Sequence, residues 1–404
     1  MSSNLLQNMT AAVEAGEDRT MVLNMGPQHP STHGVLRLLL EIDGETILKI
    51  APDIGYLHTG IEKTYEAKFY QQGVPLADRM DYLAPFSNEL GFCLAAEKLL
   101  GLEIPKRATW MRVLLTELTR IQSHLVWLGT HAMDIGAMTV FLYCFREREE
   151  LLKIFEAIGG QRMFTSYFRV GGLAMEAPIG WFDRVKKFIS TFPEKVDEYE
   201  GLLTGNPIWQ NRTKGVAKLT ADQVIGLGGS GPILRASGVD WDLRRDMPYC
   251  GYENFQFKVP THPDGDVWAR YVVRVAEMRQ SHKICEQALE GMPEGPIKAD
   301  APKVILPNRE KMKTQMESLI YHFKIVTEGF TVPAGEVYQA VESPRGEIGF
   351  YMVSDGTAKP YRVHVRAPSF ANLSLVEPMC QGRLIADVVA AIGSIDIVLG
   401  DVDR

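Results

Sequence analysis

The chain has 404 residues, 46% of them hydrophobic, with 43 basic and 50 acidic residues that leave a net charge of −7. This composition is that of an ordinary globular protein with one or two sizeable cores, and it excludes a fibrous or intrinsically disordered chain. The acidic balance gives no support for binding nucleic acid or an anionic membrane surface.

Cysteine spacing and hydropathy exclude further classes of protein. The five cysteines are widely separated and form no C-x-x-C pair, so the sequence offers no disulfide framework and no local zinc or iron–sulfur motif. No apolar run approaches the roughly 18 residues that span a bilayer, and Met1–Thr20 lacks the features of a signal peptide. We therefore expect a reducing compartment and only peripheral association with a membrane.

The first distinctive segment is PQHPSTHGVLRL, which places His29 and His33 four residues apart before a predicted strand. Pro30 disfavours a helix here because it pushes the residue before it out of the helical region. A loop that enters a strand fits better, and these residues alone favour an ordinary turn over a catalytic or metal site. His29 is interpreted as structural, and a metal site made of both histidines is the least favoured interpretation.

The next elements carry sheet signals and then helix signals. Asp43-Gly44 lies between two apolar runs and predicts a hairpin. Apolar residues that recur at spacings of four and three predict a long amphipathic helix; they are Leu114, Leu118, Ile121, Leu125 and Leu128. A second long helix is predicted after Asp266, a suitable N-cap. Its His282 and Cys285 are interpreted as core residues because no second pair of metal ligands is nearby.

Towards the C-terminus the pattern returns to strands. The glycine-rich GLGGSGP at 226–232 lacks the spacing of a phosphate loop and is interpreted as a flexible connection. A proline-rich passage over 293–307 precedes a predicted strand in which Tyr361, Val363 and Val365 alternate with polar residues. The predicted fold class is α+β, with a mainly helical body, built as a long helix bundle, and small β-sheets near both ends.

Six segments in chain order resemble one known family: GPQHPSTHGVLRL, IGYLHTGIEK, RMDYL, ESPRGEIGFYMVSDG, VRAPSF and GDVDR. They resemble the quinone-site (D-type) subunit of the proton-pumping NADH:quinone oxidoreductase, respiratory complex I, from about Val22 to Arg404. The expected regions are a flexible arm over 1–20, an α/β region with the quinone-site loop over 21–85, a helical bundle over 86–325, and a β-containing region over 326–404 packed back on the cavity.

That family is itself similar to the large subunit of nickel–iron hydrogenases, so the expected fold is hydrogenase-large-subunit-like. Hydrogenases bind their metals through two C-x-x-C pairs, whose equivalents here fall at Arg79–Ala84 and Asp396–Arg404. Neither segment contains a cysteine. Nickel and iron in that setting require thiolates, so we expect no metal ligands in this chain and no hydrogenase chemistry.

The resemblance implies a site for a quinone. Tyr82 and His33 match the family's headgroup-binding tyrosine and histidine, and a phenol and an imidazole are suitable donors to two separated carbonyls. Asp134 matches the acidic partner of that histidine, where a carboxylate favours the imidazolium. Without the resemblance, each of these three residues would be interpreted as an ordinary structural residue.

The resemblance also implies the source of electrons, because this chain holds no cluster or flavin motif. The expected donor is a [4Fe-4S] cluster in an adjacent partner subunit. Arg79 and Arg169 match family arginines near that cluster, and an ion-pairing role is an equal alternative for Arg169. One position departs from the family pattern, since Phe164 stands where a histidine is common.

The predicted function is that of a core subunit of a proton-translocating NADH:quinone oxidoreductase, inactive alone, on the cytoplasmic side of the cell inner membrane. Its expected partners are the iron–sulfur subunit and other peripheral-arm and membrane-arm subunits of complex I. Alternatives are a related complex with another electron donor, such as ferredoxin or a reduced deazaflavin, and a noncatalytic hydrogenase-like scaffold. The sequence does not distinguish ubiquinone from menaquinone.

Overall fold

The computed structural model describes residues 20–29 and 34–404. The predicted N-terminal arm, apart from Thr20, therefore lies outside the described residues, as does His33. The chain begins with an antiparallel sheet of order β1-β2-β3, formed by β1 (Thr20–Met25), β2 (Arg37–Asp43) and β3 (Thr46–Asp53). The hairpin predicted at Asp43-Gly44 is confirmed.

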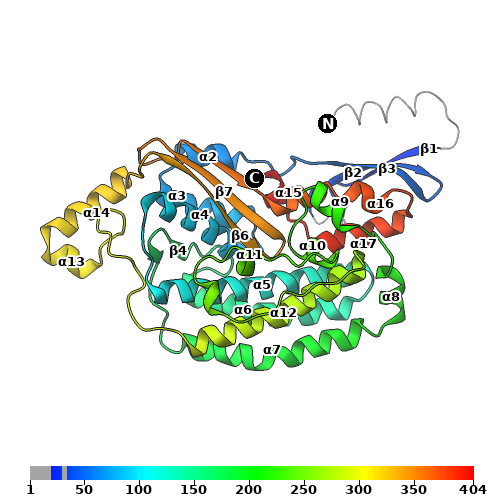
Figure 1. Cartoon of the computed structure of the whole chain (residues 1–404), viewed down its shortest axis with the longest axis horizontal. Helices are drawn as coiled ribbons and strands as arrows, with labels where there is room; N and C mark the ends of the chain where they lie inside the picture. The colour runs from blue at the N-terminus through cyan, green and yellow to red at the C-terminus, as the bar shows by residue number, and fades with distance from the viewer. Residues whose placement is uncertain (1–19, 30–33) are drawn as a thin grey trace.

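A bundle of long helices forms the body, as Figure 1 shows. Its members are α4 (Pro85–Leu100), α5 (Lys106–Asp134), α6 (Met138–Gly159), α7 (Trp181–Leu203) and α12 (Val267–Glu290). The predicted stripe from Leu114 to Leu128 lies on α5, and all five of its residues are buried. Around α5 the bundle builds the larger of two main apolar cores.

The second predicted long helix is also confirmed. Asp266 caps α12, because its Oδ1 accepts a hydrogen bond of 2.8 Å from the Ala269 amide. His282 and Cys285 are buried core residues, and His282 Nε2 lies 2.9 Å from the carbonyl oxygen of Ile189. Their interpretation as packing residues is therefore confirmed.

Shorter helices and a small sheet connect the long helices. The helices are α2 (Ile61–Ala67), α3 (Tyr70–Met80), α8 (Pro207–Thr213), α9 (Ala221–Gly226), α10 (Pro232–Ala236), α11 (Leu243–Asp246) and η2 (Tyr252–Asn254). The sheet pairs β4 (Phe168–Arg169) with β5 (Gly172–Leu173) and was not predicted, because two-residue strands carry no alternation that a sequence can reveal.

The last quarter of the chain holds two helices, a second three-stranded sheet and four further helices. They are α13 (Arg309–Thr314), α14 (Met316–Glu328), β6 (Gly335–Ser343), β7 (Gly346–Ser354), β8 (Arg362–Arg366), α15 (Pro368–Leu373), α16 (Val376–Cys380), α17 (Ile385–Ile395) and α18 (Leu399–Asp403). The strand order is β6-β7-β8. The α+β class, with a helical body and small sheets near both ends, is confirmed.

One detail of the predicted C-terminal strand is wrong. Val363 and Val365 are buried, but Tyr361 is 68% exposed and precedes β8. Tyr361 is two positions before Val363, so strict alternation would place both side chains on one face of the strand. The strand begins only at Arg362, and the alternation therefore does not extend to Tyr361. Within the described ranges, no helix is long and apolar enough to cross a membrane.

The second apolar core joins the N-terminal sheet to the C-terminal helices. It contains Leu38, Leu40 and Ile42 from β2 and residues from α16 to α18. Figure 1 shows this arrangement, with the blue N-terminal sheet beside the red C-terminal helices. Ile135, directly after α5, packs against both cores, so the helical body meets the second core there.

Candidate functional site

A buried charged cluster lies where three segments distant in the sequence meet. Arg345, in the turn between β6 and β7, is fully buried, and its Nη1 lies 2.6 Å from Asp81 Oδ2. Its Nη2 lies 3.3 Å from Asp396 Oδ1. Asp401, on α18, is also buried and faces the same charges. We call Arg345, Asp81, Asp396 and Asp401 the Arg345 cluster.

Backbone packing fixes the position of Arg345. A Cβ built on Gly231 would lie 2.3 Å from the Cα of Gly346, so the glycine-rich 226–232 connection fits directly against the turn. Asn372 Nδ2 donates to the Arg345 carbonyl oxygen at 3.2 Å. The 226–232 segment is indeed a connection, between α9 and α10, and its glycines permit this close approach.

A second glycine brings the RMDYL and GDVDR segments together. A Cβ on Gly400 would lie 2.6 Å from the Met80 carbonyl oxygen and 3.0 Å from that of Arg79. The RMDYL and GDVDR segments are therefore in contact. No group of three or more His, Cys, Asp or Glu side chains suited to a metal ion occurs in the described part of the chain.

We expect Gly400→Ala to destabilise the chain by about 2 kcal/mol, because the new methyl group must push apart two backbone segments. The matched control is Gly201→Ala on α7, where nothing lies within 4 Å of the new Cβ. That change should be neutral or stabilising by up to about 1 kcal/mol. Thermal unfolding of both variants measures the difference, and equal midpoints would contradict the close contact.

Asp401 has an unusual environment for a carboxyl group. The Ser369 amide donates to its Oδ2 at 3.0 Å, while its Oδ1 is buried without a hydrogen-bond partner among the described residues. Burial and the nearby Asp81 carboxylate raise the pKa of Asp401 to about 6. Asp401 is therefore a buried carboxyl group whose pKa is raised towards neutral pH.

The Asp401 pKa predicts a pH-dependent stability. The raised folded-state pKa means that folding takes up a proton between about pH 4 and 6, so this group lowers stability as pH rises through that window. Asp401→Asn should remove a penalty of about 3 kcal/mol that is present at pH 7 and absent below pH 4. Thermal midpoints should therefore diverge between pH 4.5 and 7, and a constant difference would contradict the raised pKa.

Tyr82 lies at the edge of the Arg345 cluster and is half-buried. Burial raises the pKa of its phenol; Arg345 opposes this shift, and Asp81 and Asp396 add to it. Its hydroxyl makes no hydrogen bond to any residue that the structure describes. The side chain is thus a protonated donor that remains available to a ligand.

The structure locates the surroundings of the other two headgroup candidates. The predicted His33 lies outside the described residues, but the flanking His29 and Gly34 form a β-bridge. A Cβ on Gly34 would lie 3.2 Å from Leu399 Cδ1, so the end of this loop is close to α18. Asp134 is the half-buried last residue of α5. One turn earlier, His131 packs closely against Gly393 of α17.

Arg79, which was predicted to lie near a partner's iron–sulfur cluster, is the first residue of the RMDYL segment. The Arg79 guanidinium carbon lies 4.9 Å from the centre of the Phe164 ring, and Arg79 Nη1 donates to the Pro75 carbonyl at 2.7 Å. The 164–168 segment is held by Ser166, which donates to Asp78 Oδ2 through its amide at 3.0 Å and its hydroxyl at 2.7 Å. Arg169 is exposed and borders a separate cavity of about 450 Å³.

The sequence predicted no role for Arg345, Asp396 or Asp401, although all three lie in segments that carry the family resemblance or border them. The available signals were an arginine between Pro344 and Gly346, residue types that are typical of turns, and isolated acids in the apolar run DIVLGDVD. Charges in such positions end up buried only if a partner from elsewhere reaches them. That partner could not be identified from local patterns.

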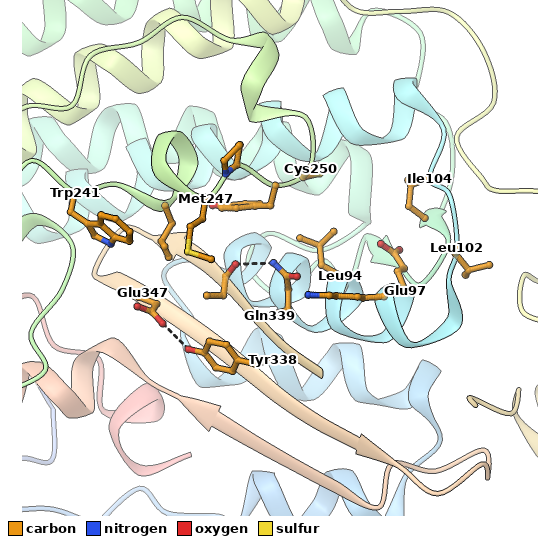
Figure 2. Close-up of a pocket in the computed structure, with 15 residues that line it drawn as sticks. Leu94, Glu97, Leu102, Ile104, Trp241, Met247, Cys250, Tyr338, Gln339 and Glu347 are labelled. Carbon is orange, nitrogen blue, oxygen red and sulfur yellow. Dashed lines mark hydrogen bonds between the residues drawn. The ribbon is translucent and has the colours of Figure 1, made fainter. Parts of the chain in front are cut away.

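A cavity of about 670 Å³ beside β6 is unrelated to these residues. Figure 2 shows its lining, which includes Trp241, Met247 and Tyr338. The Tyr338 hydroxyl donates to Glu347 Oε1, another lining residue, at 2.6 Å. It contains none of the predicted site residues, so its substitutions serve as controls.

Comparison with known proteins gives consistent matches. Residues 134–404 match the family described as respiratory-chain NADH dehydrogenase, 49 kDa subunit. The chain is 75% identical over 397 residues to a D-type NADH-quinone oxidoreductase subunit of Koribacter versatilis, covering 98% of this chain and 99% of the relative. It is 68% identical to a D-type subunit of the same enzyme from Solibacter usitatus, with 98% and 97% covered. Identity to the D-type subunit of Trichlorobacter lovleyi is 58%, with 95% and 98% covered.

Proposed function

Because this chain belongs to the family of the 49 kDa subunit of respiratory-chain NADH dehydrogenase, we propose that it forms the quinone-reducing chamber of an NADH:quinone oxidoreductase. Family membership makes it a core subunit of that oxidoreductase and makes other subunits of the complex its partners. The observation that carries the proposed chamber is the Tyr82 phenol, which has no hydrogen-bond partner among the described residues and lies beside the buried Arg345 cluster.

Quinone reduction requires a proton donor at each carbonyl oxygen as electrons arrive. Tyr82 donates a hydrogen bond to one carbonyl, and the raised pKa of its phenol keeps it protonated at neutral pH. Asp401, with a pKa of about 6, binds and releases a proton nearby. Arg345 offsets one of the two negative charges of Asp81 and Asp396, so uptake of one proton would leave the buried ion pairs neutral.

His33 and Asp134 complete the proposed headgroup site. The imidazole donates to the second carbonyl, and the carboxylate favours its protonated form. The contact between Gly34 and Leu399 supports this placement, because it brings the loop end to α18. If the two side chains act as one unit, the effects of His33→Ala and Asp134→Asn combine less than additively on quinone reduction.

Electrons reach the quinone from a partner subunit in this proposal. A [4Fe-4S] cluster there would supply electrons one at a time. Neither Arg79 nor Arg169 forms an ion pair with a described residue. Both guanidinium groups are therefore suited to face an anionic group of the partner subunit. Positive charge at these positions would stabilise the reduced form of that cluster.

Phe164 leads to a prediction for the pH dependence of the reduction potential of the partner's iron–sulfur cluster. A histidine near an iron–sulfur cluster gains a proton when the cluster gains an electron, whereas phenylalanine cannot titrate. We expect a potential nearly independent of pH around neutrality, and a pH slope in Phe164→His. Potentiometric titration of the cluster's paramagnetic signal in the assembled complex measures both, and a clear slope in the parent protein would contradict the prediction.

We place this chain on the cytoplasmic side of the cell inner membrane, attached through other subunits. The names of the relatives support NADH as the electron source over ferredoxin or a deazaflavin. A hydrogenase activity is disfavoured because Arg79–Ala84 and Asp396–Arg404 contain no cysteine. The buried cluster beside Tyr82 favours a catalytic chamber over a scaffold.

The test is labelling with a photoreactive quinone analogue in the assembled complex. The expected adducts lie in the peptides that contain Tyr82 or Asp401, and excess unmodified quinone should suppress them. Labelling confined to the cavity of Figure 2, or labelling that excess quinone leaves unchanged, would contradict the proposed chamber.

A further inference from the structure

The α13–α14 segment extends away from the helical body. Figure 1 shows it in yellow, beyond the ends of the bundle helices. No residue of α13 is buried, and Ile325 is the single buried residue of α14. The base of this arm is nevertheless fixed, because Gln71 Nε2 donates to the Ile325 carbonyl at 2.8 Å. We call residues 309–328 the arm.

The arm exposes an apolar stripe along α14. Its members recur at helical spacing and are Met316, Leu319, Ile320, Phe323 and Val326. Their exposed fractions run from 47% to 74%. Five large apolar side chains on one face are unusual for a surface that water alone covers, and they identify a binding face.

The stripe continues into the cavity of about 450 Å³ at the base of the arm, where Val326 is a shared wall residue. Two cations, Arg169 and Lys298, border this cavity, and its lining contains no acidic residue. Partial burial and the charge of Arg169 lower the pKa of Lys298. Neither side chain forms an ion pair with a described residue, so a carboxylate placed between them would be attracted by both.

We propose that the apolar stripe of the arm and the Arg169–Lys298 cavity together dock another subunit of the complex, through an apolar segment that carries an acidic side chain. This proposal rests on the proposed function, because it requires an assembled complex. The positive charges of Arg169 and Lys298 require an acidic side chain in the partner. The apolar stripe of α14 requires apolar residues on either side of that acid.

The arm's own charge favours a protein over a membrane as its partner. Residues 309–328 contain four basic and three acidic residues, so their net charge is close to zero. Helices that lie on anionic membranes carry an excess of Lys and Arg on the polar face. A near-neutral arm with a broad apolar stripe is better suited to another polypeptide.

Photo-crosslinking tests the docking surface directly. A benzophenone amino acid replaces Phe323 in the full chain, the complex is assembled and irradiated, and adducts are identified by mass spectrometry. The expected adduct joins this chain to another subunit, within a peptide that contains Asp or Glu among apolar residues. An adduct with phospholipid, an adduct with a second copy of this chain, or no adduct would overturn the proposal. Position 247, with Met247 60% exposed, is the control site.

Variants give a second, quantitative test. Phe323→Ser and Lys298→Glu should each lower the fraction of this chain that stays bound after dilution by about tenfold, as expected for anchors of an interface. Lys298→Arg should retain binding. Matched controls are Met247→Ser and Lys186→Glu on the exposed side of α7, which should have no effect. Equal retention in all variants would overturn the proposal.

Failure of docking and failure of the proposed function give different results. Quinone reduction per assembled complex should be unchanged in Phe323→Ser, because the arm touches none of the proposed chamber residues. A defect limited to assembly therefore supports docking by the arm. A failure of the proposed function would instead appear as normal quinone reduction in Tyr82→Phe.

Discussion

Replacing Arg345 with methionine is expected to lower the free energy of unfolding by about 3–5 kcal/mol. The change leaves the carboxylates of Asp81 and Asp396 buried without their counter-ion, and both are less than 7% exposed. Burial already raises the pKa of Asp81 despite the charge of Arg345. Denaturant unfolding of the variant measures the loss.

The matched control is Arg362→Met on the same sheet. Arg362 also pairs with a carboxylate, at 3.1 Å from Glu66, but its side chain is 47% exposed. Water solvates both charges there, so the expected loss is at most about 1 kcal/mol. Similar losses at the two positions would show that burial of the Arg345 cluster does not determine its energy.

A triple variant separates repulsion between the acids from loss of packing. Arg345→Met combined with Asp81→Leu and Asp396→Leu removes the arginine and both of the carboxylates that it pairs with. Because buried ion pairs often contribute little beyond what apolar side chains provide, the triple variant should be more stable than Arg345→Met alone. A further loss of stability would indicate that polar contacts to the backbone dominate.

The sequence predicted those features of the fold that arise within one segment. The stripe on α5, the N-cap Asp266 and the hairpin at Asp43-Gly44 each depend on residues fewer than 30 positions apart, so periodicity and turn chemistry reveal them. The contact between Arg79 and Phe164 was not predicted, because these residues are more than 80 positions apart in the sequence.

The Arg345 cluster could not be predicted in this way. Arg345 is 264 positions from Asp81 and 51 from Asp396, and its burial depends on how the sheets and α18 pack. Local patterns contain no information on such packing. The exposed position of Tyr361 has a similar cause, since the boundary of β8 depends on pairing with β7. The assignments of Tyr82, His33, Asp134, Arg79 and Arg169 came from resemblance and remain proposals.

Tyr82→Phe is expected to slow quinone reduction about 100-fold, the lower end of the usual effect of removing a proton donor. Electron entry, measured as NADH oxidation with an artificial acceptor, should be unchanged because the substitution is remote from that step. Stability should change by less than about 0.5 kcal/mol. The reason is structural: the hydroxyl makes no hydrogen bond to the described protein, and the ring that fills the space is retained.

Tyr338→Phe provides the control, since it removes a hydroxyl from the cavity of Figure 2 and breaks the bond to Glu347. It should leave quinone reduction intact. A buried tyrosine that served only the fold would show the opposite behaviour, with lost stability and normal turnover. If Tyr82→Phe keeps full quinone reduction, the phenol does not donate to the headgroup. If it also impairs oxidation by the artificial acceptor, the defect lies before the quinone, and Tyr82 acts through the structure of the complex.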